Sequence, residues 1–180
     1  MLQQMARIVI IGNTGSGKTT LARTLAQRLD RPHIELDALF WEPDWKQAET
    51  AVFRARVAEA IAGEQWVIDG NNHRVRDLVW ARAELLIWLD YPLRVHFWRL
   101  MRRTLRRVVH REELWNGNRE TWKAQFLSRD SLFVWLFKGY RRHRREWPVA
   151  LERYSHLTVI RLRSPRETEK WLAQQLILSR

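Results

Sequence analysis

The chain has 180 residues, 46% of them hydrophobic, so it can bury one sizeable core and is short for two ordinary domains. The absence of cysteine excludes disulfides and thiolate metal sites and fits a reducing compartment, so a cytoplasmic location is expected. A net charge of +12, carried mostly by arginine, favours anionic partners such as nucleotides, phosphorylated metabolites or nucleic acid. The N-terminus shows no export-signal pattern, and no apolar run approaches the roughly 20 residues that span a bilayer, so no membrane partner is expected.

The first predicted element is a strand over 7–11, a β-branched run typical of strands buried on both faces. Residues 12–19 then read Gly-x-x-x-x-Gly-Lys-Thr, and residues 20–29 carry leucines at helical spacing. This order of strand, loop and helix predicts a phosphate-binding loop, with Lys18 at the β- and γ-phosphates of a nucleotide and Thr19 as a Mg²⁺ ligand. The candidate nucleotide-binding residues are Gly12, Asn13, Thr14, Gly15, Ser16, Gly17, Lys18, Thr19 and Thr20.

Two further predicted strands each end in a carboxylate. Residues 33–37 lead to Asp37 and residues 66–71 contain Asp69, and ligands of parallel sheets sit beyond the carboxyl ends of the strands. Asp37 is therefore a candidate catalytic residue that faces the nucleotide, although it can also cap the following turn. Asp69 is a candidate Mg²⁺ ligand, usually through water, although Asp-Gly is also a common turn pair.

The remaining pattern predicts a fourth strand over 85–90, a helix that starts at Pro92, a fifth strand over 157–162 and a closing helix over 165–178. Strands that alternate with helices indicate an α/β fold, a parallel sheet doubly wound by helices. We expect one domain, with its core in residues 1–93 and 151–180 and a helical insertion over 94–150.

The insertion is helical, basic and aromatic. Its first helix is predicted to pack an apolar stripe and to expose arginines on the other side; the stripe is Val95, Trp98, Met101, Leu105 and Val108. Most of the arginines fit a solvated face, but phosphoryl transfer needs cations around the moving group, and a helical lid can supply them. The candidate lid arginines are Arg103, Arg107 and Arg129, of which Arg129 can equally be the neighbour of a helix cap at Asp130.

Eleven tryptophans raise the alternative of base stacking on exposed rings. Most, such as Trp66, Trp88 and Trp98, are predicted to pack in the core. Trp41, Trp45 and Trp115 lie near predicted loops and are the rings expected closest to a ligand.

Four stretches together resemble the adenylate-kinase-related P-loop proteins often labelled topology modulation proteins: residues 12–19, "IELDALFW", "WVIDGNN" and "IWLDYPLRVHFWRLMRR". The resemblance covers nearly the whole chain. It implies a nucleoside-monophosphate-kinase-like P-loop NTPase fold with five parallel strands and a helical lid, binding ATP and Mg²⁺.

The resemblance also implies roles for single residues. Lys18 and Thr19 match the phosphate lysine and the magnesium threonine, and Asp69 matches the Asp-Gly after the third strand of adenylate kinases. Arg103 falls in an arginine pair that resembles the start of the adenylate kinase lid. Arg163 and Pro165 fall where such kinases pass a loop under the adenine. Adenylate kinases continue after this Asp-Gly with Phe-Pro-Arg, whereas this chain continues after Gly70 with Asn-Asn-His-Arg. The resemblance therefore does not imply that AMP is the acceptor.

The sequence therefore favours a kinase that transfers the γ-phosphoryl group of ATP to a small-molecule or nucleotide acceptor, with Asp37 orienting or deprotonating an acceptor hydroxyl. The alternatives are a nucleic-acid-associated ATPase, suggested by the charge, and a nucleotide-gated regulatory protein.

Overall fold

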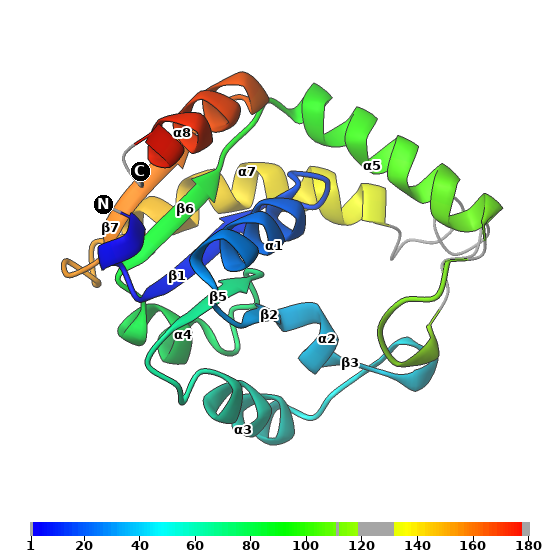
Figure 1. Ribbon diagram of the computed structural model, residues 1–180. Coiled ribbons are helices and arrows are strands. Elements are labelled where there is room, and N and C mark those ends of the chain that lie inside the picture. The colour runs from blue at the N-terminus through cyan, green and yellow to red at the C-terminus, as the bar shows by residue number, and fades with distance from the viewer. Residues whose placement is uncertain (1, 111, 119–131, 178–180) are drawn as a thin grey trace.

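The computed structural model describes residues 2–110, 112–118 and 132–177. Five strands form one parallel sheet in the order β2-β5-β1-β6-β7 (Figure 1). These strands are β1 (Arg7–Gly12), β2 (His33–Glu35), β5 (Trp66–Asp69), β6 (Leu85–Leu89) and β7 (Thr158–Leu162). A short antiparallel pair, β3 (Trp41–Glu42) and β4 (Lys46–Gln47), lies outside this sheet. The predicted parallel sheet of five strands is confirmed.

The helices of the described residues are α1 (Lys18–Leu29), α2 (Leu36–Phe40), α3 (Thr50–Ala60), α4 (Arg76–Arg82), α5 (Leu93–Val109), α7 (Leu132–Leu151) and α8 (Pro165–Ile177). Short 3-10 turns lie at η1 (Leu2–Gln4), η2 (Pro43–Trp45) and η3 (Trp115–Gly117). The second strand stops two residues before its predicted end, because the chain turns into α2 at Leu36. Asp37 therefore lies in the first turn of a short helix, directly beyond the sheet.

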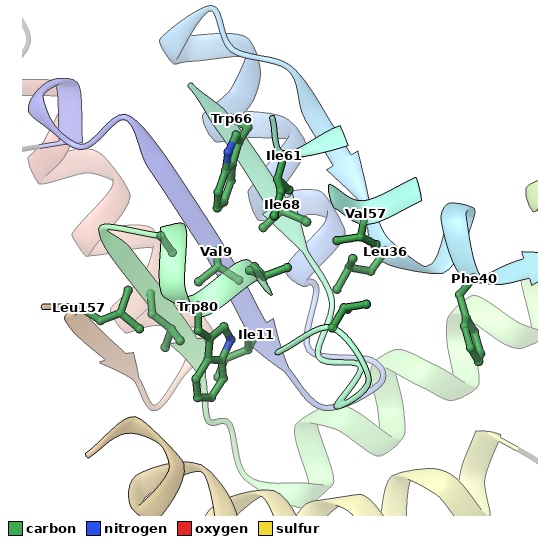
Figure 2. Packing of buried hydrophobic residues seen from close by; sticks show 14 of the residues in the cluster. Val9, Ile11, Leu36, Phe40, Val57, Ile61, Trp66, Ile68, Trp80 and Leu157 are labelled. Carbon is green, nitrogen blue, oxygen red and sulfur yellow. The ribbon is translucent and has the colours of Figure 1, made fainter. Parts of the chain in front are cut away.

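Side chains along the central strand β1 point alternately to the two faces of the sheet, so the core has two layers. Ile8 and Ile10 of β1 belong to a buried cluster with residues of α1 and α8, such as Leu25. Val9 and Ile11 point to the opposite face, where they pack with residues of α3, α4 and α7 (Figure 2). Helices thus cover both faces of the sheet, as in a doubly wound fold.

Helix α7 is anchored to the sheet through one tryptophan. Trp147 is 1% exposed and packs edge-on against Trp88 of β6, with ring centroids 5.3 Å apart. On its other side the ring of His143 is stacked at 4.2 Å. The segment predicted as an insertion therefore contributes to the core at its C-terminal end.

Helix α5 buries a different face from the one that its apolar stripe predicted. Trp98 is 62% exposed, and Leu105 is also exposed, whereas His96, Leu100 and Thr104 are buried. The prediction holds for Val95, which packs against the core, and is wrong for Trp98 and Leu105, because the middle of α5 faces the loop after β1 with His96 and Leu100.

We predict that Trp147→Ala lowers the free energy of unfolding by about 3 to 5 kcal/mol, because it leaves a cavity between α7 and the sheet. Trp135→Ala is the matched control, since Trp135 lies on the same helix and is 52% exposed; its change should stay within about 0.5 kcal/mol. Urea unfolding measures both values, and equal effects would contradict the packing described for α7.

Two imidazoles, that of buried His96 and that of half-buried His143, make the stability depend on pH. Burial lowers the pKa of His143 to about 3, and the positive charge of Arg142 lowers it further. Burial likewise lowers the pKa of His96 to about 4, with a further contribution from the charge of Lys18. In the unfolded chain both titrate near 6.5, so the unfolded state binds more protons between about pH 4 and 6.5. Stability is therefore complete above pH 6.5 and decreases as the pH falls below it.

We predict a lower urea midpoint at pH 5 than at pH 7.5. His143→Phe keeps an aromatic ring against Trp147 and removes one titrating group, so its midpoint should change less between the two pH values. An identical pH dependence in the variant and the parent protein would show that His143 is not the group responsible.

Candidate functional site

The loop between β1 and α1 has the backbone that its glycines predict. Gly15 and Gly17 adopt positive φ angles of 74° and 87°. A Cβ atom on Gly15 would lie 2.6 Å from the carbonyl oxygen of His96, so a larger residue would push α5 away. The loop then enters α1 at Lys18, where the first N–H groups of the helix have no intrahelical acceptor and are available to phosphate.

Helices α5 and α7 hold this loop from outside. The Asn13 side-chain amide donates to the carbonyl of Leu136 in α7 at 3.0 Å, and Asn13 is 8% exposed. Arg99 of α5 donates to the carbonyl of Ser16 at 3.0 Å. Ser16 itself is fully buried. Asn13 and Ser16 are thus structural parts of the loop, while Thr14 and Thr20 lie nearer its surface.

A buried carboxylate lies beside the end of the loop. Asp69, the last residue of β5, is 4% exposed, and its Oδ1 accepts a hydrogen bond of 2.8 Å from the Thr19 hydroxyl. Its other oxygen, Oδ2, lies 2.8 Å from Nε2 of His33. The two predicted metal ligands are therefore neighbours, although they come from positions 50 residues apart in the chain.

This pair of oxygens fits Mg²⁺, which takes one or two protein oxygen ligands and completes its shell with phosphate oxygens and water. The described residues contain no group of three or more His, Cys, Asp or Glu that could hold a metal by themselves. Such a pair is what a metal that arrives with a nucleotide requires, because the phosphates supply the missing ligands.

Asp37 faces the same region from α2. Its side chain is exposed by surface area, yet protein groups surround it closely, and the resulting desolvation raises the pKa of its carboxyl. The charges of Lys18 and Arg103 oppose this shift, whereas those of Asp69 and Glu35 add to it. These interactions place Lys18, Asp69 and Arg103 near Asp37.

The predicted lid arginines that the structure describes, Arg103 and Arg107, have different surroundings. Arg103 is partly buried on α5 and acts electrostatically on Asp37, whereas its neighbour Arg102 is exposed. Arg107 is 17% exposed, and its Nε lies 3.8 Å from Glu112. Arg129 lies outside the described residues. The structure thus brings Arg103 to the predicted site and gives Arg107 a local acidic partner.

The loop after β7 has a structural explanation of its own. The Ser164 hydroxyl accepts a hydrogen bond from the backbone N–H of Glu167, and the Glu167 carboxylate accepts one from the N–H of Arg163. Pro165 is the first residue of α8, where proline is well tolerated. This arrangement begins α8, and contact of Arg163 and Pro165 with a base stays a prediction.

Turn η3 docks on the β3–β4 hairpin, on the right of Figure 1. Asn118 is 4% exposed; its amide donates to the carbonyl of Glu42 at 2.9 Å, and its oxygen accepts from the N–H of Trp45 at 2.8 Å. Trp115 donates from Nε1 to Glu35 at 3.0 Å. Trp41 and Trp45 pack edge-on, so these rings hold the hairpin together. Sequence reasoning missed the role of Asn118.

A small cavity opens between α2 and the loop after β5, lined by Leu36, Gly70, Asn71, Asn72, Val75, Arg76, Val79 and Trp80. Burial lowers the pKa of Arg76, and its guanidinium lies over the Trp80 ring at 5.1 Å. Among the described residues, Arg76 has no hydrogen-bond or ion-pair partner. Arg74, nearby in the chain, has a neutral partner in Gln47 at 3.0 Å.

Sequence reasoning also missed His33 and Glu35. Both point to one face of β2, since they are two residues apart on a strand; His33 contacts Asp69, and Glu35 contacts Trp115. No local signal in the sequence marks these two residues, because their position follows from the pairing of β2 with β5, which sets Glu35 opposite Asp69. Which strands are neighbours was not readable from the chain.

The chain was compared with known families and proteins. The profile of the family described as shikimate kinase matches residues 14–134. The shikimate kinase of Symbiobacterium thermophilum is 35% identical over 100 residues, which cover 46% of this chain and 56% of that protein. The match thus spans little more than half the length of this relative.

Solved structures agree on the fold. A shikimate kinase from Bacteroides thetaiotaomicron has a TM-score of 0.58 at 19% identity and covers 97% of this chain and 98% of its own. A shikimate kinase from Acinetobacter baumannii in complex with shikimate has a TM-score of 0.54 at 17% sequence identity, and the match covers 99% of this chain and 96% of that one. A gluconokinase from Sinorhizobium meliloti 1021 has a TM-score of 0.51 at 18% sequence identity, and the match covers 97% of this chain and 97% of that one.

These matches support the P-loop kinase class that the sequence indicated but not the finer resemblance to topology modulation proteins. The described part of the chain contains no helix with the length and apolar character needed to cross a bilayer. Because the family profile covers more than half of the 180 residues, the chain belongs to the shikimate kinase family of P-loop kinases, which are ATP-dependent phosphotransferases that use Mg²⁺.

Proposed function

We propose that this protein transfers the γ-phosphoryl group of ATP to a hydroxyl of a small acceptor that carries an anionic group, with shikimate as the first candidate. The observation that carries the proposal is the convergence of Lys18, Asp69 and Asp37 beyond the carboxyl ends of three neighbouring strands. Parallel sheets bind ligands at this edge.

The nucleotide side of the site is formed by the loop. Its N–H groups and Lys18 would hold the β- and γ-phosphates, and Thr19 with Asp69 would hold Mg²⁺, which supplies charge neutralisation when bound. Arg103 reaches the same region from α5 and would stabilise charge on the transferred group.

The acceptor side starts at Asp37. A carboxylate with a raised pKa next to the phosphate lysine suits the orientation or deprotonation of an acceptor hydroxyl. The proton would move from the hydroxyl oxygen to a carboxylate oxygen of Asp37 as the oxygen attacks the γ-phosphorus, while the bond from phosphorus to the β–γ bridging oxygen breaks and ADP leaves. Were the acceptor a phosphate, no base would be required, so the dependence of the rate on Asp37 reports on the acceptor group.

The anionic group of the acceptor has a candidate partner in Arg76. This arginine lines the cavity that begins at Leu36, the residue before Asp37, and its partly buried guanidinium forms no ion pair among the described residues, although the charge of Glu146 acts on it from farther away. A hydroxy acid could therefore place its carboxylate at Arg76 and a hydroxyl toward Asp37. Shikimate and gluconate both have this chemistry, which is consistent with the names of the family and of the fold neighbours.

We predict ADP formation from MgATP that depends on one hydroxy acid in a panel of shikimate, gluconate, nucleosides, nucleoside monophosphates and DNA. Coupled ADP release and the mass of the phosphorylated product are the measurements. Lys18→Ala should remove the activity because the phosphate charge loses its cation. Acceptor-independent ADP release at the same rate would contradict the kinase proposal.

We predict that Asp37→Asn lowers kcat by about 100-fold or more with a hydroxyl acceptor, in the range of lost acid–base catalysis. Arg76→Gln should instead raise the KM for the acceptor about tenfold or more, since an ionic contact with the substrate is lost. Arg166→Gln, an exposed arginine on α8, is the control. If Arg76→Gln left the acceptor KM unchanged, the anionic group would bind elsewhere.

We predict that Arg103→Ala lowers kcat by about 100-fold while the urea midpoint stays nearly constant. Arg102→Ala is a matched control, because Arg102 precedes it on α5 and is exposed. Equal kinetics for the two variants would reduce Arg103 to a surface charge.

Nucleic acid binding is the second candidate function. The outer side of α5 and α7 exposes Trp98, Trp135 and Phe137, with exposed fractions of 62%, 52% and 51%, among arginines. Exposed rings with cations suit stacking of bases and contacts to phosphates. ATPase stimulation by DNA alone, lost as salt rises, would favour this function over the kinase.

A further inference from the structure

The carboxylate of Asp69 is held at both oxygens. Oδ1 accepts from the Thr19 hydroxyl at 2.8 Å, and Oδ2 lies 2.8 Å from Nε2 of His33. A carboxylate only accepts hydrogen bonds, so Nε2 of His33 must carry the proton in this contact. The side chains of Asp69 and His33 are 5% and 16% exposed, so little water competes for either position.

The other side of the His33 ring faces a second carboxylate, that of Glu35. The second nitrogen of this ring, Nδ1, lies 3.9 Å from the Glu35 carboxylate, and Glu35 accepts hydrogen bonds of 3.0 Å from Arg23 and from Nε1 of Trp115. Trp115 belongs to η3, which follows the lid helix α5. A series of polar contacts therefore connects the lid segment, through Glu35 and His33, to Asp69 beside the phosphate-binding loop.

We propose that His33 is a positioning residue that fixes the Asp69 carboxylate for the metal–nucleotide complex, and that Trp115 acts on the same carboxylate through Glu35. The proposal rests on the proposed function because it assigns a role at the Mg²⁺ site of that reaction. A hydrogen bond at Oδ2 stops rotation of the carboxylate and leaves Oδ1, beside Thr19, directed at the metal position. Loss of such a partner typically weakens metal binding about 10- to 100-fold.

The test measures Mn²⁺ binding by electron paramagnetic resonance in the presence of ADP and without any acceptor. His33→Leu removes the donor and should weaken Mn²⁺ binding about tenfold or more. His33→Gln places an amide N–H at similar reach and should restore most of the affinity. His156→Leu is the control, because the polar and ring contacts of His156 within the described part of the chain are with the Trp80 carbonyl and the Tyr154 ring.

His33→Asn completes the series, since its amide is one methylene too short to reach Asp69. Should His33→Leu fail to fold, the Gln and Asn variants decide: weaker Mn²⁺ binding for Asn than for Gln supports the proposal, and equal binding overturns it. For folded His33→Leu, wild-type Mn²⁺ affinity overturns it as well.

Trp115→Phe keeps the ring and removes the Nε1–H donor. It should weaken Mn²⁺ binding in the same direction as His33→Leu but less, and it should have no further effect in the His33→Leu background. Full additivity of the two changes would overturn the part of the proposal that concerns Trp115. Because no acceptor is present, these results stand or fall independently of the acceptor panel.

Discussion

The close approach of α5 to the phosphate-binding loop is the constraint on which the site depends. Gly15 leaves no room for a Cβ atom against the His96 carbonyl, and Arg99 and Asn13 tie the loop to α5 and α7. These contacts hold the loop from two sides, directly before the start of α1 at Lys18. The same contacts set the position of Arg103, which lies one turn beyond Arg99 on the same helix.

Most of the fold could be predicted from the sequence, because β1, β5 and β6 are short apolar runs, each of which ends at or just before a glycine or a carboxylate. Lys18, Thr19 and Asp69 were identified from the loop motif and from the end of a strand, and the structure places Thr19 and Asp69 in contact. The buried face of α5 was not predictable in this way. Hydropathy selects apolar residues for burial, whereas this helix packs on the polar backbone of the loop and buries His96 and Thr104.

The residues that sequence reasoning missed have one property in common: their partners are distant in the chain. His33 meets Asp69 only because β2 lies next to β5, and Asn118 meets Glu42 across 76 residues. Neither contact has a local spacing that a motif could record. The cavity proposed for the acceptor has the same origin, since it forms where Leu36 of α2 meets the loop that leads into α4. These contacts therefore depend on the order of the strands and not on any short segment.

The charge on α5 has a consequence for how the site is entered. This helix carries six arginines, Arg94, Arg99, Arg102, Arg103, Arg106 and Arg107, and no acidic residue. Like charges on one helix repel each other and Lys18, and a polyphosphate would relieve that repulsion when it binds. Nucleotide capture should then be an electrostatically steered encounter, with an association rate that falls as ionic strength rises and a dissociation rate that depends on short-range contacts.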